Sequence, residues 1–502
     1  MKILIVNRFF GGAQIPTGRM AEDVARVLVE AGHEVVALAS SGEYVGAARR
    51  ADGIRHTACG TRVEQVRVPK WMPRALAWVW FTWQARKRIP RIDWDVCVLM
   101  TDPPLLPLLA AKAACGEWRV ASDECTETEH QPEDRTTETP PHRPKRRVAV
   151  WLMDLYPEAL AASGWIGRNN PIYKWYFEKR QRALGAADLL ICLGEAQKAL
   201  AQKYEGEKVG RWEGSSREQG IGHGEQVAGK TGRPNYRPTE IPTPTLTQCV
   251  RTVVVPPWDD RGNIALATEG SLKNLALYAG NLGEAHCFEE ILAAAPHLPG
   301  DWTIRFAARG AKLAALKAAA SVIRHTAESI RSEAKGTRDE SGSGSGVNSG
   351  SLKLTDLKLK TAPSELKRLK DQEAKRLGAK IEITGYASEG ETPGLLASAR
   401  VHLITMSPGW EGIVVPSKLY GCIRTGRPVL FIGPENADTA REIRANDWGK
   451  VLPPGASGED VAAAILHLAE KSTSSAQVRN GAQLVARSLE RLAENCSSTV
   501  EH

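Results

Sequence analysis

The chain has 502 residues, of which 42% are hydrophobic and 25% are charged, so it is neither disordered as a whole nor too short for two domains with separate cores. The formal net charge of +8 is modest for this length and would suit a phosphorylated ligand or an anionic surface. No stretch approaches the roughly 20 apolar residues that span a bilayer, so we expect no transmembrane helix.

The first forty residues alternate between strand and helix patterns. KILIV at 2–6 is typical of a buried strand, MAEDVARVLVEAG at 20–32 has apolar residues at helical spacing, and HEVVALAS at 33–40 predicts a second strand. A strand–helix–strand unit of this length implies a parallel sheet. Further strands of this series are expected at DVCVLMT (95–101), RVAVWLMD (147–154) and DLLICLG (188–194).

A second alternating series follows residue 250. Its expected elements are RTVVVPP, ALYAGNLG, a helix around FEEILAAAP, then WTIRFAARG, IEITGYA, VHLITM and PVLFIGP. Two such series predict an α/β protein with two Rossmann-like domains facing each other across a cleft. We expect the domains at 1–260 and 261–475, with a C-terminal helix and tail at 476–502.

Three segments interrupt these series, at about 116–146, 205–247 and 325–362. They are rich in Gly, Ser, Thr, Pro and charged residues and poor in apolar ones. Such segments cannot bury enough apolar surface to offset their ordering entropy, so we expect mobile insertions.

The amino terminus and the cysteines favour a cytosolic protein. MKILIVNRFF contains only a short apolar run, too short for a signal peptide. The nine cysteines are scattered without a C-x-x-C spacing, which favours reduced thiols and argues against a zinc site.

The stretch SPGWEGIVVPSKLYGCIRTGRPVLFIGP at 407–434 carries the strongest chemical signal. The strand VHLITM before it and the loop SPGWEG place Glu411 at the carboxyl end of a parallel strand, and a helix is expected to open at Pro416, with Ser417 able to cap it. A helix N-terminus with Lys418 beside it is a phosphate site by its unpaired amides and positive charge. The alternative is a plain strand–loop–helix with a solvated Glu411.

This stretch resembles the nucleotide-sugar-binding segment of family 4 retaining glycosyltransferases of the GT-B fold, in the branch that builds O-antigen, capsule and other exopolysaccharides. Together with the other matching segments it covers most of the chain outside the three insertions. Those segments, in order, are HEVVALAS, TDPPLLPLLAAKA, VWLMDLYPEALAASG, VVVPPWDD, LYAGNLGEAHCFEEIL, FAARGAKLAAL and ITGYA.

The resemblance implies a donor site in the C-terminal domain. Glu411 resembles the first Glu of the family's E-x7-E pattern, which touches the donor sugar, whereas Gly421 stands where the second Glu would bind the ribose. Asn281 and His286 replace an Arg and a Lys that neutralise the diphosphate in many relatives. The remaining implied donor-binding residues are Gly412, Ile413, Val414, Val415, Ser417, Lys418, Gly280, Arg309 and Tyr386.

On the amino-terminal side, the loop GGAQIPTGR resembles the family's acceptor-facing Gly-rich loop, with Thr17 and Gly18 able to approach the reacting phosphate. A tight turn would also explain these glycines. Asp154 ends a strand that faces the cleft and is a candidate for an acceptor contact or a catalytic acid–base role. The alternative for Asp154 is an N-cap of the helix that follows it.

Metal and dinucleotide chemistry are not expected. Asp93-Trp94-Asp95 has the D-x-D form of some metal sites, but it lies at the amino end of a strand, away from the cleft. The resemblance likewise implies a metal-independent reaction without a cofactor. GGAQIPTG lacks the G-x-G-x-x-G spacing of a dinucleotide-binding dehydrogenase.

The segment PKWMPRALAWVWFTWQARKRIPR at 69–91 combines tryptophans with basic residues, as interfacial helices do. We expect it to dock on an anionic membrane, and the alternative is an amphipathic helix packed on its own domain. Five basic residues at about 1 kcal/mol each support reversible docking rather than permanent anchoring. The membrane-facing candidates are Trp71, Trp78, Trp80, Trp83, Arg86, Lys87 and Arg88.

Taken with the resemblance, the sequence predicts a cytoplasmic, peripherally membrane-associated glycosyltransferase. It would transfer a sugar from a nucleoside-diphosphate sugar, with UDP favoured over GDP, to a lipid-linked or polysaccharide acceptor, with retention at the anomeric carbon. Two alternatives stay open: a nucleotide-sugar epimerase of the same fold, and a non-catalytic sugar-nucleotide-binding protein, which the missing Glu and the missing basic pair keep possible. No nucleic-acid partner is expected.

Overall fold

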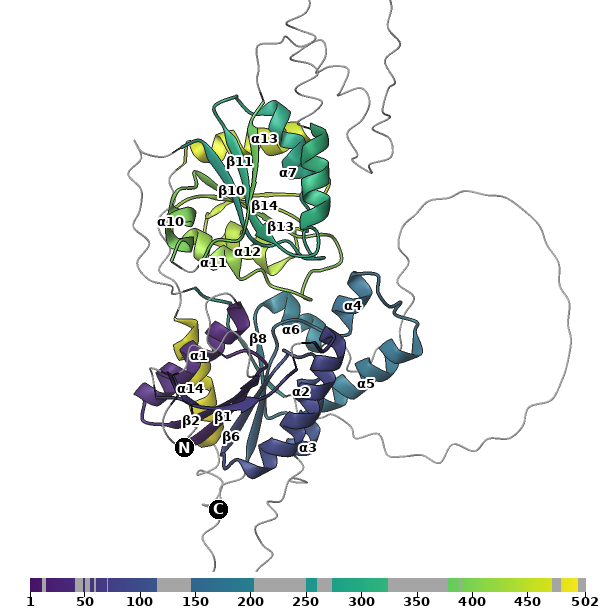
Figure 1. The fold of residues 1–502 in the computed structure, drawn as a ribbon, viewed down its shortest axis with the longest axis vertical. Coiled ribbons are helices and arrows are strands. Elements are labelled where there is room, and N and C mark those ends of the chain that lie inside the picture. The colour runs from purple at the N-terminus through teal and green to yellow at the C-terminus, as the bar shows by residue number, and fades with distance from the viewer. Residues whose placement is uncertain are drawn as a thin grey trace, which may run out of the picture.

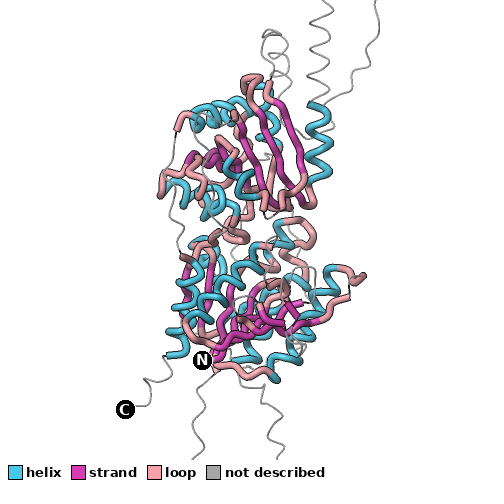
Figure 2. Tube along the Cα trace, turned by 60° about the vertical axis from the view of Figure 1, so that its left-hand side comes forward, coloured by secondary structure: helices cyan, strands magenta, loops and turns pink. Residues whose placement is uncertain are grey.

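The computed structural model of the chain forms two α/β domains stacked along its long axis (Figures 1 and 2). The predicted insertions lie outside the described residues, apart from Arg146. The residues that the structure describes are 1–10, 15–40, 48–49, 55–57, 60–69, 71–114, 146–202, 250–259, 273–323, 378–388, 390–471 and 480–494.

The N-terminal sheet has the strand order β3-β4-β5-β2-β1-β6-β7-β8-β9. Its pairings are parallel except at β3 and β4, and the order reverses between β1 and β6. RTVVVPP, expected to open the second series, instead forms β9 and pairs with β8 in this first sheet. The strands are β1 (Lys2–Val6), β2 (Glu34–Ser40), β3 (Ala48–Arg49), β4 (Arg55–His56), β5 (Arg62–Val66), β6 (Val96–Met100), β7 (Arg147–Trp151), β8 (Leu189–Cys192) and β9 (Arg251–Val254).

Helices cover both faces of this sheet, as its continuous buried strands require (Figure 1). The first helix begins at Pro16, four residues before the expected start, because proline suits the first turn of a helix. Its buried stripe, which includes Met20, Val24 and Leu28, packs on the sheet. The helices are α1 (Pro16–Glu30), α2 (Arg74–Arg88), α3 (Ala110–Ala114), α4 (Glu158–Ala162), α5 (Pro171–Gly185) and α6 (Glu195–Gln202), with 3-10 turns η1 (Ile89–Arg91) and η2 (Leu106–Leu109).

The C-terminal sheet is parallel throughout, with the order β12-β11-β10-β13-β14-β15, and it reverses between β10 and β13. This confirms the predicted α/β class with two Rossmann-like domains, the GT-B arrangement. The elements are β10 (Leu275–Asn281), α7 (Glu289–Ala294), η4 (Ala295–His297), β11 (Thr303–Arg309), β12 (Lys380–Thr384), α10 (Thr392–Ala397), β13 (Val401–Thr405), α11 (Lys418–Ile423), β14 (Val429–Ile432), α12 (Asp438–Ala445), β15 (Gly449–Leu452) and α13 (Gly458–Ala469).

The last helix, α14 (Gly481–Glu494), returns to the N-terminal domain and packs beside α1 (Figure 1). Where it begins, Gly481 lies against the Trp258 ring, and a Cβ at that position would collide with it. The Trp258 indole N–H donates to Asp23 Oδ2 on α1 at 2.9 Å. The segment that leaves the N-terminal sheet after β9 and the helix that returns to it are thus packed together.

Polar contacts also connect the two domains directly. Leu155 N, in the loop after β7, donates to Ile413 O in the loop after β13 at 2.9 Å. Asp438 Oδ1, at the start of α12, accepts from Ala196 N in the first turn of α6 at 2.8 Å. The carboxyl ends of both sheets therefore face the junction between the domains, where open α/β sheets bind ligands.

Candidate functional site

The carboxyl edge of the C-terminal sheet gathers four polar side chains at the point where the strand order reverses. His286 follows β10, Arg309 ends β11, Tyr386 follows β12, and Lys418 opens α11 after β13. Neighbouring parallel strands bring these loops together: Asn281 at the end of β10 is in register with Arg309. Such a reversal leaves a crevice between loops that diverge to opposite faces of the sheet.

Lys418 is the centre of a polar cluster at this edge. Its Nζ donates to the Tyr278 hydroxyl at 2.7 Å and lies 3.4 Å from both Asn281 O and His286 Nε2. His286 Nδ1 lies 2.6 Å from Thr405 O, which can only accept, so this nitrogen carries the proton and Nε2 faces the lysine as an acceptor. Every partner of the ammonium group is therefore neutral.

The ammonium group of Lys418 lacks a counter-ion in the described part of the chain. No carboxylate there lies within ion-pair distance of this lysine. Burial lowers the pKa of Lys418 to about 7. Burial, together with the neighbouring Lys418, lowers the pKa of His286 well below its ordinary value. A bound anion would supply the missing counter-charge.

Two predicted donor residues, Arg309 and Tyr386, meet beside this cluster. The Arg309 guanidinium lies 4.4 Å from the centroid of the half-buried Tyr386 ring. Gly280 adopts a φ of +142°, which glycine tolerates, and a Cβ there would lie 3.4 Å from Lys418 Cε. Gly280 thus leaves room for the lysine stem, while the Arg309–Tyr386 pair offers a cationic and aromatic surface further along the sheet edge.

The loop between β13 and α11 departs in part from the expected phosphate cradle. The amides of Ile413 and Val414 donate to Trp410 O at 3.1 and 3.4 Å, so they already have partners. The helix begins at Lys418 rather than at Pro416, and Ser417 precedes it without a side-chain cap bond. Positions 416 and 417 form turns instead, in which their carbonyls accept from residues three positions on.

Glu411 and Gly412 lie where this loop meets the N-terminal domain. Glu411 is half-buried. Gly412 has a φ of +71°, and a Cβ there would come within 2.6 Å of Ala196 O, so the close approach of α6 requires glycine. Val415 is half-buried and packs against the core of the N-terminal domain. The 411–415 loop is thus part of the junction between the domains.

A pair of carboxyl groups lies at the carboxyl edge of the N-terminal sheet. Asp102 follows β6, and Asp154 follows the neighbouring strand β7. Thr101 Oγ1 joins the two loops, because it accepts from Met153 N at 2.8 Å and from Asp154 N at 3.2 Å. Arg8 N, after β1, donates to Asp102 O at 2.6 Å. Three adjacent strands thus place the two aspartates together.

Both carboxyl groups are shifted toward neutrality. Burial raises the pKa of Asp102 to about 6, against the attraction of Arg8 and Arg74. The Asp154 side chain keeps contact with solvent, but protein surrounds it closely enough that desolvation, and then Asp102, raise its pKa to about 6. Carboxyl groups with such pKa values can accept and donate protons near neutral pH.

The sequence placed Thr17 and Gly18 in a loop, and the structure corrects this, because both lie in the first turn of α1; their approach to the reacting phosphate stays a prediction. Gly18 is buried, and Thr17 Oγ1 is buried without a hydrogen-bond partner in the structure. The alternative role for Asp154 as an N-cap is also wrong, because Pro157 precedes α4 and makes no side-chain cap bond.

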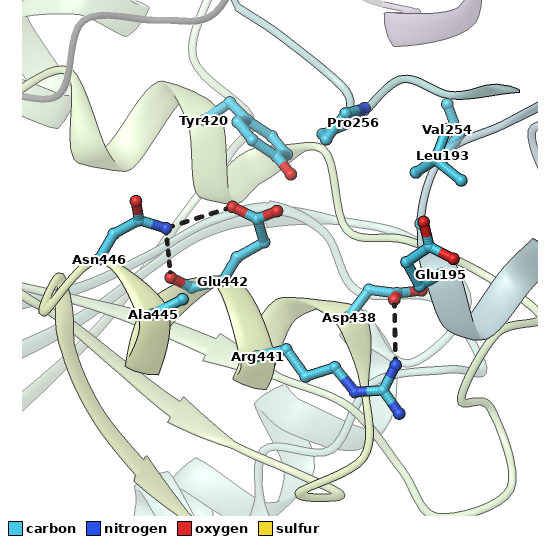
Figure 3. Close-up of a pocket in the computed structure, with 11 residues that line it drawn as sticks. Leu193, Glu195, Val254, Pro256, Tyr420, Asp438, Arg441, Glu442, Ala445 and Asn446 are labelled. Atoms are coloured by element: carbon cyan, nitrogen blue, oxygen red, sulfur yellow. Dashed lines mark hydrogen bonds and ion pairs between the residues drawn. The ribbon is translucent and has the colours of Figure 1, made fainter.

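A pocket of about 510 Å³ lies between the domains, on the side of α6 and α12 (Figure 3). Arg441 reaches Asp438 at 4.0 Å, Asn446 Nδ2 donates to Glu442, and the Tyr420 ring lies above Glu442. None of the predicted donor residues lines this pocket. A Cβ at Gly194 would collide with the Asp438 carboxylate, so the two domains approach each other closely at the wall of this pocket.

The predicted membrane segment consists of α2 and the residues just before it, and its tryptophans lie in two environments. Ala77, Phe81 and Ala85 form the stripe that packs on the domain. Trp71 and Trp83 are exposed, together with Arg86 and Lys87. Three other side chains that were predicted to face the membrane instead contact the protein. Trp78 lies 6.0 Å from the Tyr156 ring, Trp80 Nε1 donates to Arg67 O, and Arg88 donates to Gln65 O.

The described part of the chain offers neither a metal-binding cluster nor a membrane-spanning helix. No group of three or more His, Cys, Asp or Glu side chains in it could hold a metal ion. In the D-x-D tripeptide, Asp93 pairs with Lys2 Nζ at 2.7 Å, Asp95 accepts from Lys2 N, and Trp94 is buried. No described helix is both long and apolar enough to cross a bilayer.

Two residues of the site were not predicted from the sequence: Asp102, and Tyr278, the partner of Lys418. Asp102 lies two residues after the end of β6, as Asp154 lies shortly after β7, so position after neighbouring strands was the available signal. Tyr278 lies within β10 in an apolar run, and its hydroxyl could not be distinguished from that of any core tyrosine.

No family model and no curated relative matches the chain. Among solved structures, the chain is similar to HepE from Anabaena in complex with UDP and glucose (11% identity, 100% of this chain and 99% of that chain, TM-score 0.48). It is also similar to WaaG, a glycosyltransferase involved in lipopolysaccharide biosynthesis (13%, 99% and 95%, TM-score 0.46), and to α,α-trehalose 6-phosphate synthase from Burkholderia multivorans (13%, 99% and 95%, TM-score 0.49). The fold assignment above rests on the sheet topology of this chain itself.

Proposed function

We propose that the chain is a glycosyltransferase that uses a nucleoside-diphosphate sugar, with UDP favoured over GDP. The observation that carries this proposal is Lys418, a lysine surrounded by neutral partners at the strand reversal of the C-terminal sheet. The resemblance of the 407–434 stretch to a nucleotide-sugar-binding segment supports the same ligand class. Lys418 would then supply the positive charge that an Arg and a Lys supply in many relatives, at the positions held here by Asn281 and His286.

The proposed sugar transfer would use the different charges of the two sheet edges. The bond between the anomeric carbon and the diphosphate oxygen breaks, a bond to the acceptor hydroxyl oxygen forms, and the hydroxyl proton passes to the departing diphosphate. Lys418 stabilises the negative charge that develops on that diphosphate. Glu411 contacts the donor sugar. The configuration at the anomeric carbon is retained, as in the family that the 407–434 stretch resembles.

The acceptor belongs on the N-terminal side of the junction in this proposal. Asp102 and Asp154 can accept hydrogen bonds from sugar hydroxyls but repel phosphate. The acceptor is a lipid-linked or polysaccharide sugar, and the protein acts in the cytoplasm, at the inner face of the membrane, through α2. The basic residues Arg86 and Lys87 at the end of that helix support docking on an anionic surface.

Calorimetric titration of the purified protein with UDP, GDP and ADP tests the donor site. We expect selective UDP binding, and loss of that binding in Lys418→Ala. Selective GDP binding that needs Lys418 would keep the site and change the donor. A folded protein that binds none of the three would contradict the proposal. Binding without any sugar transfer or donor hydrolysis would instead favour the non-catalytic alternative.

A further inference from the structure

Exposed large hydrophobic side chains concentrate in two segments of the N-terminal domain. Eight such side chains are exposed in the described part of the chain, and seven of them lie within 71–83 and 165–175. The first segment contributes four from α2 and its approach, among them Trp71, which is 79% exposed. The second contributes Trp165, which is 78% exposed, with Ile172 and Trp175. A clustering of this kind marks an interaction surface rather than scattered surface residues.

The second segment is held in place by its own backbone. Trp165 N donates to Leu160 O at 3.0 Å at the end of α4, and Asn170 Oδ1 accepts from Ile172 N at 2.8 Å to cap α5. Along α5, Tyr173 and Tyr176 face the core. Ile172 and Trp175 share the opposite, outward face, because residues three apart in a helix are neighbours. The exposed aromatic rings are thus presented by an ordered element.

Tyr156 connects the two segments. Its ring packs edge-on against Trp78 of α2, and its carbonyl accepts from Arg180 of α5 at 2.9 Å. Figure 1 shows α2, α4 and α5 on the same side of the N-terminal domain. Tyr156 also lies two residues after Asp154, so this surface adjoins the carboxyl edge where the two aspartates lie.

The charges around both segments are mainly positive. Residues 71–91 contain five Lys or Arg and no acidic residue, and residues 164–179 contain three Lys or Arg and one exposed acid, Glu178. Tryptophan rings beside an excess of cations fit the headgroup level of an anionic bilayer, where the rings enter the interface and the cations meet phosphate. A protein partner of ordinary composition would supply no reason for this excess of cations.

We propose that the 165–175 segment is a second membrane-contacting element, which acts together with the exposed face of α2 to dock the N-terminal domain on an anionic bilayer at two points. This inference extends the membrane docking in the proposed function from one helix to a two-point surface. Two points of contact fix the orientation of the domain, so the edge with Asp102 and Asp154 is held at the bilayer surface. An acceptor anchored in the lipid could reach that edge without leaving the membrane.

Co-sedimentation with vesicles tests this surface. The full chain is mixed with vesicles of phosphatidylcholine alone or of phosphatidylcholine with phosphatidylglycerol. We expect binding to the anionic vesicles to be at least about tenfold stronger. The double variant Trp165→Ala/Trp175→Ala should weaken that binding about tenfold, and Trp83→Ala should weaken it in the same direction. Leu484→Ala, an exposed apolar residue on α14, is the matched control and should bind as the wild type does.

The inference would be overturned if the double variant bound anionic vesicles as the wild type does, or if the wild type bound both vesicle types equally. It would also be overturned if the wild type bound no vesicles but formed a dimer in sedimentation velocity, and the double variant were a monomer. Titration with UDP separates this test from the donor site. Variants that lose vesicle binding but retain UDP binding support the surface. A protein that binds vesicles in the expected order but not UDP would refute the donor site alone.

Discussion

The two sheet edges that meet at the domain junction carry opposite chemistry. On the C-terminal side, Lys418 is surrounded by a tyrosine, a neutral histidine and a backbone carbonyl, with no carboxylate in ion-pair reach among the described residues. On the N-terminal side, burial raises the pKa of Asp102 to about 6, and the closely surrounding protein, with the charge of Asp102, raises the pKa of the solvent-exposed Asp154 to about 6. One edge is therefore suited to an anion and the other to hydroxyl groups.

This contrast in charge would allow the two domains to divide one reaction between them. A charged diphosphate is stabilised beside the cation Lys418, whereas aspartates would repel it. A neutral sugar has no charge for the lysine to balance, and its hydroxyls can donate hydrogen bonds to carboxylates. The domains thus differ in charge at equivalent places in the same fold, and each prediction below changes one side while leaving the other as a reference.

The largest expected effect is on the stability of the acidic side. Arg180 and Glu158 form a bidentate ion pair with bonds of 2.6 and 2.8 Å, and Arg180 also donates to Tyr156 O in the loop that carries Asp154. Glu158→Gln leaves the arginine buried without a counter-charge, which should cost about 3–5 kcal/mol of unfolding free energy. Urea unfolding measures this loss.

A partly exposed ion pair gives the control for that experiment. Arg305 and Glu382 pair at 2.8 Å with side chains that are 28% and 24% exposed, so Glu382→Gln should cost only about 0–1 kcal/mol. UDP binding near Lys418 should survive Glu158→Gln at temperatures where the protein stays folded. A parallel loss of UDP affinity would show that the two edges are not independent.

The next effect is on the anion site itself. Lys418→Met removes the charge but keeps an unbranched apolar stem beside Gly280. Charge-assisted hydrogen bonds contribute about 1.5–3 kcal/mol, so UDP affinity should fall about ten- to a hundredfold in calorimetry. Lys450→Met, at an exposed lysine on β15, should leave the affinity unchanged. Equal UDP affinities of Lys418→Met and Lys450→Met would show that Lys418 does not bind the diphosphate.

The sequence predicted the two α/β series and the strand–loop–helix around Glu411 because apolar periodicity reports burial directly. It could not predict which sheet RTVVVPP joins, since β9 has no local mark of its partner β8. It placed Lys418 beside a helix N-terminus but could not find Tyr278, 140 positions away in the sequence. The pairing of Asp102 with Asp154 depends on strand order, which periodicity does not contain.

A smaller effect should appear as a pH dependence of the anion site. Burial lowers the pKa of Lys418 to about 7, and a bound diphosphate favours the charged lysine and raises that pKa. Above pH 7 the free protein must therefore take up a proton on binding, and UDP affinity should fall by up to about tenfold per pH unit. His286 stays neutral in this window because its pKa is well below its ordinary value. Calorimetry in buffers of different ionisation enthalpy counts the protons, and Lys418→Met should abolish the uptake.

The smallest expected effect is a gain of stability on the acidic side. The pKa of Asp154 is raised from 3.8 to about 6, so the folded state binds more protons than the unfolded state between those values, and stability falls as the pH rises through that window. Asp154→Asn removes this cost. Because the Asp154 side chain is exposed, solvent screens most of it, so the unfolding free energy at pH 7 should rise by about 1 kcal/mol or less, with no gain below pH 4. Thermal melts across this range measure the difference. Asp188→Asn is the contrasting variant, because Asp188 accepts from Arg147 Nη1 and Val148 N at 2.8 Å and its loss should destabilise the protein. A destabilised Asp154→Asn would mean that the aspartates serve the fold rather than an acceptor.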